Sequence, residues 1–231
     1  MSNIAVITFY TPNYTVGDST STINKVYCDH NNYDFHKIKG DLHASATGKA
    51  PSWSKLGYLR DVIATKKYEY VMWVDADAFF CNKDMKIETW ISCAGDKDLI
   101  IGRDAGFNLS TFIGGGRTAV NCGIMIWKSC DNNMEILTTL LTDTKFSPYY
   151  IKPNWEQNAI IQCMSENVNQ ITDRTHVIED TNFNNNCNNI EDYITNGGFI
   201  VHLTNFNGQF HKHTDGLKLK AVWPLLKGVG T

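Results

Sequence analysis

The chain has 231 residues, of which 42% are hydrophobic and 19% are charged, and its formal net charge is -3 at pH 7. This share of apolar residues suffices for a sizeable core, which excludes an intrinsically disordered chain. No basic patch stands out, which argues against nucleic acid as the main partner. The length suits one domain, and we expect residues 1–231 to form it.

Cysteine use and hydropathy indicate the compartment. The seven cysteines are scattered and none are in a C-x-x-C pair, so reduced thiols are favoured over a disulfide frame or a zinc site. No apolar stretch is long enough to span a bilayer. The first strand-like run, residues 4–9, begins so early that it leaves no room for a signal peptide. These features predict a soluble, cytoplasmic protein without a transmembrane segment.

Apolar runs typical of strands alternate along the chain with amphipathic runs typical of helices. The predicted strands are residues 4–9, 33–38, 70–74, 99–101, 120–127 and 199–203, and the predicted helices are residues 19–30, 53–65, 134–141 and 155–163. The glycine-rich residues 113–117 and the Asn-rich residues 182–189 read as loops. The alternation predicts an α/β fold with a Rossmann-like, mostly parallel central sheet flanked by helices.

A pair of acids, Asp75 and Asp77, directly follows the apolar run Val71–Val74. Ligands of open α/β sheets bind at the carboxyl ends of strands, which is where the pair falls. Two like charges so close repel each other, and a divalent cation relieves this by taking ligands from both. Oxygen ligands suit magnesium or manganese, which also bind phosphate oxygens. A solvated turn is the alternative, but Phe79 and Phe80 return the chain to the core at once, so we favour a metal site.

Three residues near the end of the sequence are candidates to complete this site. His202 ends a short apolar strand, and an imidazole suits manganese as well as zinc, although a hydrogen-bonded core histidine is an equally good interpretation. Gly208 allows a tight turn where backbone could approach a phosphate. Lys212 could neutralise that phosphate, although solvated lysines are the commoner case.

Five motifs, which follow one another along the chain in the order expected for the family, resemble those of the GT-A glycosyltransferases of family 34. This family contains fungal α-mannosyl- and α-galactosyltransferases and plant xyloglucan α-xylosyltransferases. The motifs are Ser54-Lys55-Leu56 with Leu59-Arg60, Trp73-Val74-Asp75-Ala76-Asp77-Ala78, Asn121-Cys122-Gly123, Trp155-Glu156-Gln157-Asn158-Ala159, and Val201-His202 followed by Gly208. The resemblance extends from Ile4 to about His213. It implies a GT-A fold and a metal-dependent transferase that moves a hexose or pentose from a nucleotide-sugar to a glycan or glycoprotein acceptor with retention of anomeric configuration.

The resemblance also implies roles for individual residues. Asp75, Asp77 and His202 would hold a divalent metal, with Mn²⁺ favoured over Mg²⁺ because of the histidine. The nucleotide and its phosphates would contact Thr8, Tyr10, Lys55, Asp75, Ala76, Gly208 and Lys212. Asn121 and Gly123 would shape the sugar pocket. Asp104 would lie beside the donor sugar or acceptor, and Glu156 and Gln157 would lie beneath the anomeric carbon, either as a covalent nucleophile or as a neighbour that stabilises same-face attack. UDP-sugars are favoured as donors over GDP-mannose.

The chain departs from the family in three respects. We expect it to lack an amino-terminal anchor, and it is short, so it resembles compact enzymes encoded by large viruses and bacteria; for a viral enzyme the expected location is the host cytoplasm. Glu156 stands where the family usually has Asp.

Two other function classes stay open at this point. A metal-dependent nucleotidyltransferase or phosphohydrolase also places paired acids after a strand, but it generally needs a Gly-rich phosphate loop near the chain start, and residues 8–15 contain Pro12 and no glycine. A non-catalytic carbohydrate-binding protein is the second alternative, because Trp53, Trp155 and Trp223 could stack on sugars, although core or rim packing is commoner for tryptophan.

Overall fold

The computed structural model describes residues 3–104, 120–184 and 190–203. Its centre is a six-stranded sheet in the order β2-β1-β3-β6-β5-β7. The strands are β1 (Ile4–Tyr10), β2 (Asp34–Lys39), β3 (Tyr70–Val74), β5 (Leu99–Arg103), β6 (Val120–Lys128) and β7 (Thr175–Ile178). β6 is antiparallel to both of its neighbours, and the other pairs are parallel. The predicted α/β fold with a mostly parallel central sheet is therefore confirmed.

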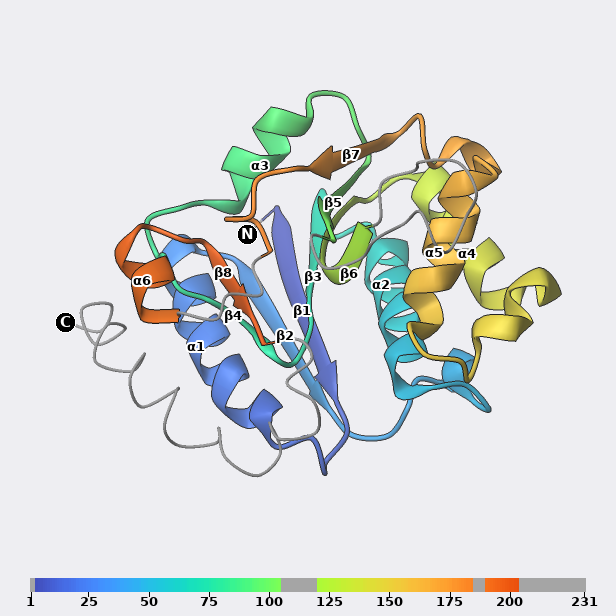
Figure 1. Ribbon diagram of the computed structural model, residues 1–231, viewed down its shortest axis with the longest axis horizontal. Coiled ribbons are helices and arrows are strands. Elements are labelled where there is room, and N and C mark those ends of the chain that lie inside the picture. Colours follow the sequence, from blue (N-terminus) through green and yellow to red (C-terminus); the bar gives the residue numbers. More distant parts are fainter. Residues whose placement is uncertain (1–2, 105–119, 185–189, 204–231) are drawn as a thin grey trace.

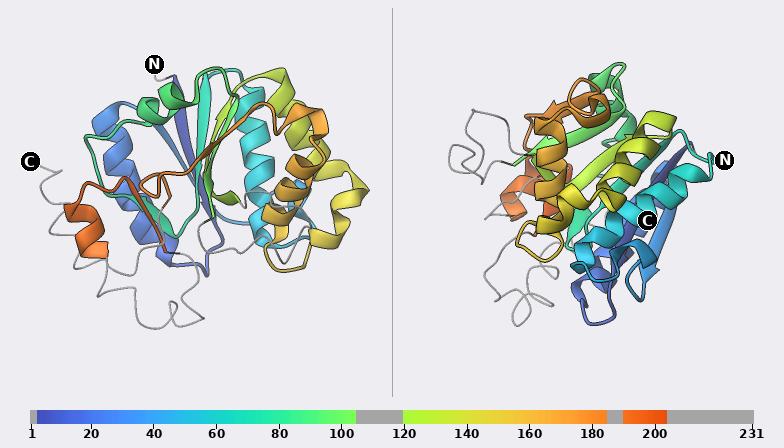
Figure 2. Two further views of the ribbon diagram at one scale, coloured as in Figure 1. Left: turned by 45° about the horizontal axis from the view of Figure 1, so that its top comes forward. Right: turned by 90° about the vertical axis from the view of Figure 1, so that its right-hand side faces the viewer.

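Helices cover both faces of this sheet (Figures 1 and 2). Helix α1 (Val16–Asn31) lies on one face, and α2 (Ser54–Ala64), α4 (Asp131–Thr142) and α5 (Trp155–Ser165) lie on the other. Two shorter helices, α3 (Ile87–Ala94) and α6 (Ile190–Thr195), follow at the periphery. Short 3-10 turns occur at Ala44–Ala46, Pro51–Trp53, Thr144–Tyr149 and Val168–Gln170.

The alternation of side chains along β1 explains why two layers of helices are needed. Ala5, Ile7 and Phe9 pack in the cluster on the α2 side of the sheet. Ile4 and Val6 pack in the cluster on the α1 side. All seven residues of β1 are buried, so the strand reads as a continuous apolar run. Burying both faces of such a strand requires helices on each side, which is the arrangement that the structure shows.

A second, two-stranded sheet joins distant parts of the chain. Strand β4 (Ala78–Phe80) pairs antiparallel with β8 (Ile200–His202), and Ala78 lies opposite His202. This small sheet packs beside α1 (Figure 1). It brings the end of the described chain to the segment that directly follows the acidic pair.

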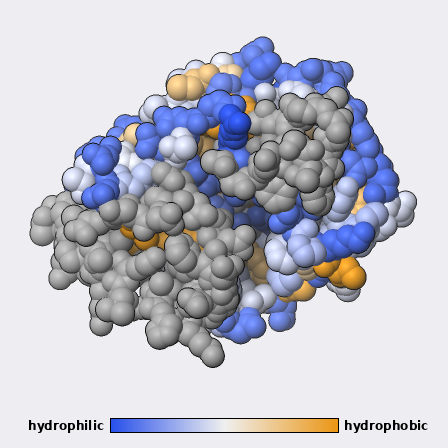
Figure 3. All heavy atoms as spheres, viewed as in Figure 1, coloured by the Kyte–Doolittle hydropathy of each residue, from blue (hydrophilic) through white to orange (hydrophobic). Residues whose placement is uncertain are grey.

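Among the coloured atoms of the face drawn in Figure 3, most are hydrophilic and the apolar ones form small separate groups. Exposed large apolar side chains include Ile151 and Trp155. Within the described part of the chain, no helix is both long enough and apolar enough to cross a membrane.

Candidate active site

The two acids lie where the two sheets meet. The Asp75 N–H donates to the Gly123 carbonyl over 2.8 Å, which extends the pairing of β3 with β6. The Leu203 N–H donates to the Asp77 carbonyl over 2.9 Å, which extends the pairing of β4 with β8. Each acid is thus fixed by a different sheet, and the residue between them makes the turn.

Buried polar side chains of α1 hold this turn in place. The Thr20 hydroxyl donates to the Ala76 carbonyl over 2.5 Å. Asn24 donates to the Ala78 carbonyl and accepts from the Phe80 N–H, each over 3.0 Å. Because buried backbone groups are costly to leave unpaired, these bonds favour one conformation of the turn and so one placement of the acids.

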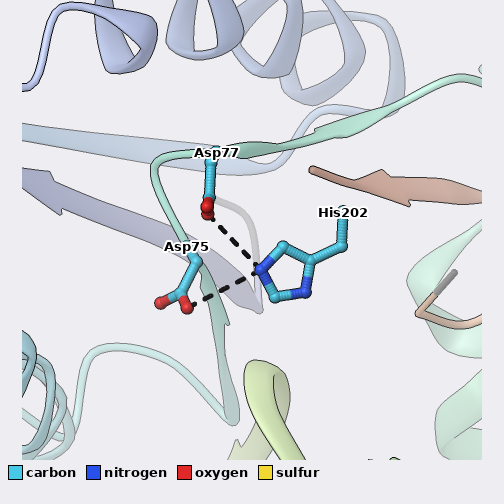
Figure 4. A group of neighbouring side chains, drawn as sticks. All are labelled: Asp75, Asp77 and His202. Carbon is cyan, nitrogen blue, oxygen red and sulfur yellow. Dashed lines mark ion pairs between the residues drawn. The ribbon is translucent and has the colours of Figure 1, made fainter. Parts of the chain in front are cut away.

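His202 completes the group (Figure 4). Its Nε2 atom lies 3.4 Å from Asp77 Oδ1 and 3.8 Å from Asp75 Oδ2. The imidazole lies directly against the backbone of Gly123, since a Cβ at that position would be 1.9 Å from His202 Cε1. Glycine at position 123 is therefore a packing requirement of the histidine.

These three side chains fit a divalent cation. Ligand atoms that share one ion at about 2.1 Å each are separated by roughly 3–4 Å, which is the range of the Nε2 to carboxylate distances. Candidate ligand atoms of Asp75, Asp77 and His202 all lie within 4.8 Å of one another. In residues 3–104, 120–184 and 190–203, no other group of three such side chains converges in this way. The predicted metal-ligand set is thus brought together.

Lys55 is the buried cation beside this group. Its ammonium lies 2.9 Å from Asp75 Oδ1, 2.9 Å from Glu156 Oε1 and 3.0 Å from the Cys122 carbonyl. Burial by itself lowers the pKa of Lys55, but the charges of Asp75 and Glu156 outweigh it, so the pKa is raised and the lysine is charged. The predicted contact of Lys55 with the nucleotide stays a prediction.

The carboxylates have further donors that the sequence analysis did not single out. Trp73 Nε1 donates to Asp75 Oδ1 over 2.6 Å, and the Tyr14 hydroxyl donates to Asp77 Oδ2 over 3.1 Å. Burial, reinforced by the charge of Asp77, raises the pKa of Tyr14, so its hydroxyl keeps its proton. Burial is also the largest cause of the raised pKa of Asp75, and the neighbouring Asp77 adds to it. Asp75 therefore holds its negative charge at a cost that a cation would relieve.

A cavity of about 390 Å³ opens onto these acids. It lies between the carboxyl ends of β1 and β3. The chain leaves β1 through α1 on one face and reaches β3 through α2 on the other, so the cavity occupies the switch point where ligands of open α/β sheets bind. Its lining is Phe9, Tyr10, Thr11, Tyr14, Ala50, Pro51, Ser52, Lys55, Trp73, Asp75, Ala76, Asp77 and Trp155.

Of the predicted donor contacts in the described chain, Tyr10, Lys55, Asp75 and Ala76 line this cavity. Thr8 and the predicted sugar-pocket residues Asn121 and Gly123 do not. Thr8 is buried within β1, and its hydroxyl oxygen has no hydrogen-bond partner among the described residues. Tyr10 lines the cavity, and its hydroxyl donates to Asp18 over 2.9 Å. The predicted contacts Gly208 and Lys212, like the glycine-rich residues 113–117, lie outside the described residues.

The predicted catalytic residues Asp104, Glu156 and Gln157 lie close to the start of β6 and to Lys55. Gln157 Oε1 accepts from the Cys122 N–H over 3.1 Å, and Gln157 Nε2 donates to Asp104 over 3.3 Å. Glu156 is buried against Lys55, and its second oxygen has no hydrogen-bond partner among the described residues. The structure thus joins Glu156 to Asp75 through one ammonium, while the catalytic roles themselves stay predictions.

Asn184 is the other residue that the sequence analysis missed. It lies in the Asn-rich segment that reads as a loop, and its side-chain oxygen is 3.0 Å from His202 Nδ1. Asn121, a predicted sugar-pocket residue, contacts Asn184 on its other side over 2.9 Å. A run of asparagines gives no periodic signal, so only the fold reveals this contact.

Comparisons with known proteins place the site in a family context. The sequence model of the galactosyl transferase GMA12/MNN10 family matches residues 13–95, which include Lys55, Asp75 and Asp77. No curated protein sequence matches the chain.

Solved structures share the fold. A glycosyltransferase involved in the glycosylation of the major capsid of PBCV-1 is 16% identical, with a TM-score of 0.66 over 91% of this chain and 98% of that chain. The glycosyltransferase GlyE of Streptococcus pneumoniae TIGR4 is 11% identical, with a TM-score of 0.58 over 97% of this chain and 60% of GlyE. The family match across the acidic pair, together with this shared fold, identifies the chain as a glycosyltransferase of GT-A fold that is similar to the galactosyl transferase GMA12/MNN10 family.

Proposed function

We propose that the chain transfers a hexose or pentose from a nucleotide-sugar, with UDP-sugars favoured, to a glycan or glycoprotein acceptor, and that it requires a divalent cation. The observation that carries the proposal is the charge of the cluster at the cavity. Asp75, Asp77, Glu156 and Lys55 leave a formal charge of -2 when His202 is neutral. One divalent cation at Asp75, Asp77 and His202 balances this charge.

The proposed ligand set favours manganese. Carboxylate oxygens suit both Mg²⁺ and Mn²⁺, whereas an imidazole ligand shifts the preference toward Mn²⁺. When bound, the cation supplies charge stabilisation for the departing diphosphate. The aromatic and apolar lining of the cavity, which includes Phe9, Tyr10 and Trp155, gives surfaces on which a nucleoside could pack.

In the proposed reaction, the bond between the anomeric carbon and the diphosphate breaks and the electron pair leaves on the phosphate oxygen. The anomeric carbon bonds to an acceptor hydroxyl oxygen, whose proton passes to the departing diphosphate and from there to solvent. Gln157 is held between the Cys122 N–H and Asp104, so its amide is oriented before substrate arrives. Glu156 is held in place by its ion pair with Lys55, and a carboxylate there suits a developing positive charge on the sugar.

The proposal includes retention of the anomeric configuration. Retention would proceed through either a covalent intermediate or attack from the face that the leaving group occupies. Location in the cytoplasm and organisation of residues 1–231 as one domain are proposed with it.

Calorimetry with UDP-glucose, UDP-galactose, UDP-xylose and GDP-mannose, with and without Mn²⁺, tests the donor and metal together. We expect one donor to bind only with Mn²⁺ and to lose binding in Asp77→Asn, which keeps the size of the side chain but removes its charge. Asp29→Asn, an exposed acid on α1, is the matched control and should bind as wild type does. Metal-independent binding, or unchanged binding in Asp77→Asn, would contradict the proposed site.

The products then separate the function classes. A sugar transferase that slowly hydrolyses its donor releases nucleoside diphosphate and free sugar, whereas a nucleotidyltransferase or phosphohydrolase releases nucleoside monophosphate. Binding without any turnover over long incubation, with acceptor glycans supplied, would instead indicate a carbohydrate-binding protein.

A further inference from the structure

A chain of amide contacts runs from the backbone of β6 to His202. The Gly123 N–H donates to Asn121 Oδ1 over 2.9 Å. Asn184 Nδ2 donates to the same Oδ1 atom over 2.9 Å. The Asn184 side-chain oxygen then lies 3.0 Å from His202 Nδ1. Every contact has the length of a normal hydrogen bond.

The direction of these bonds is fixed at the backbone end. A backbone N–H can only donate, so the Asn121 atom that it contacts is the oxygen. The Asn184 atom that faces this oxygen must be its NH₂ group, which places the Asn184 carbonyl oxygen against His202. An amide oxygen can only accept, so His202 Nδ1 carries the proton of this bond.

Without Asn184, the surroundings of the neutral imidazole would favour the opposite tautomer. Nε2 faces Asp75 and Asp77, and two carboxylates attract an N–H (Figure 4). A proton on Nε2 would occupy the lone pair that a cation needs. At 3.4 and 3.8 Å the Nε2 to carboxylate contacts are longer than a good hydrogen bond, whereas the Nδ1 contact at 3.0 Å is not.

The packing of Asn184 supports this role. A Cβ added at Gly102 would lie 3.2 Å from the Asn184 Cβ, so the glycine gives the asparagine room to approach β5. Gly102 lies opposite Asn121 in the sheet, at a register shift between β5 and β6. Asn184 therefore packs against β5 at the position that lies opposite Asn121.

We propose that Asn184 is a positioning residue that holds His202 in the tautomer with the proton on Nδ1, leaving Nε2 as a free base between Asp75 and Asp77. Outer hydrogen-bond partners of this kind orient metal-binding histidines and raise their basicity. The proposal rests on the proposed metal site and assigns Asn184 a part in it.

The test combines ring tautomer and metal affinity. Protein labelled with ¹⁵N-histidine, metal-free and at a pH well above the imidazole pKa, gives the tautomer of His202 from long-range ¹H–¹⁵N correlations, with the signals assigned by their loss in His202→Gln. Wild type should show the proton on Nδ1. Asn184→Ala should move it to Nε2 and raise the Kd for Mn²⁺ about 10–100-fold, the usual effect of losing such a partner.

Two variants separate positioning from general loss of structure. Asn184→Asp keeps an oxygen acceptor for Nδ1–H although it loses the donor to Asn121 Oδ1, so it should retain the tautomer and a Kd closer to wild type than that of Asn184→Ala. Asn182→Ala, in the same segment, should behave as wild type. Wild-type tautomer and affinity in Asn184→Ala, or equal damage in Asn184→Asp and Asn184→Ala, would overturn the proposal. A wild type that binds no metal would defeat the proposed function, while the tautomer in the metal-free protein still decides the role of Asn184.

Discussion

Removing the buried ammonium of Lys55 should destabilise the metal-free protein strongly. Lys55 is 3% exposed, and its ammonium lies 2.9 Å from both Asp75 and Glu156. Lys55→Met keeps an unbranched apolar stem of similar length but leaves two carboxylates without their cation. Breaking a buried ion pair on one side costs about 3–5 kcal/mol, because the remaining charge is left uncompensated.

The effect is measurable as a change in the free energy of unfolding by urea, with EDTA present. In a chain of this size, 1 kcal/mol corresponds to about 2–4 °C, so the thermal midpoint should fall by roughly 6–20 °C. Lys25→Met is the matched control, since Lys25 pairs with Asp29 over 2.6 Å at the surface. Exposed pairs contribute about 0–1 kcal/mol, so the control should change little.

A double-mutant cycle tests the cause. Glu156→Gln removes one of the two charges that Lys55 compensates, so in the Lys55→Met background it should restore part of the lost stability. We expect the two effects to be non-additive by at least about 1 kcal/mol, within the range for residues in direct contact. A loss below about 1 kcal/mol in Lys55→Met, or strict additivity with Glu156→Gln, would refute the account of Lys55 as the compensating charge.

Three further predictions concern the metal-ligand set. Gly123→Ala should displace His202 and raise the Kd for Mn²⁺ at least tenfold by calorimetry, whereas Gly40→Ala, where a Cβ meets nothing within 4 Å, should not; equal Kd values in the two variants would contradict the packing argument. Tyr14→Phe should lower the unfolding free energy of the metal-free protein by about 1.5–3 kcal/mol, since it removes a donor to the charged Asp77, and an unchanged urea midpoint would argue against that bond. Mn²⁺ at 100 times its Kd should stabilise the protein by about 2.7 kcal/mol, with the gain abolished by EDTA, and a thermal midpoint unaffected by either would count against the site.

The parts of the fold that the sequence predicted are those whose signal is local. β1 and β3 are short, predominantly apolar runs, and α2 shows the helical spacing of its apolar residues, so each could be recognised without knowing its neighbours. Strands β4 and β7 and helices α3 and α6 were not predicted. β4 has three residues and β7 has four, which is too short for a period of two to stand out.

The residues of the candidate site likewise differ in whether a local sequence signal predicted them. Asp75 and Asp77 were found because their strand and their spacing are local. The contact with His202 needs Ala78 to pair with His202 across more than a hundred residues, and no pattern within either segment specifies that pairing. The family resemblance predicted His202 as a metal ligand. Its position depends on the two-stranded sheet of β4 and β8, which the periodicity of the sequence does not reveal.

The antiparallel strand β6 explains how the residues proposed to act on the sugar and those proposed to bind the cation come to lie at the same edge of the sheet. Ligand sites of parallel sheets form at the ends of strands, but β6 runs in the opposite direction and so contributes its beginning. Its first residues supply the Asn121 amide, the Cys122 N–H and carbonyl, and the bare backbone of Gly123. Through these groups one strand contacts Asn184, Gln157, Lys55 and His202. A shift of β6 by one residue would invert its faces and separate all four contacts together. The register of this strand is therefore what couples the side chains proposed to bind the cation to those proposed to act on the sugar, and substitutions that loosen it should impair both functions at once.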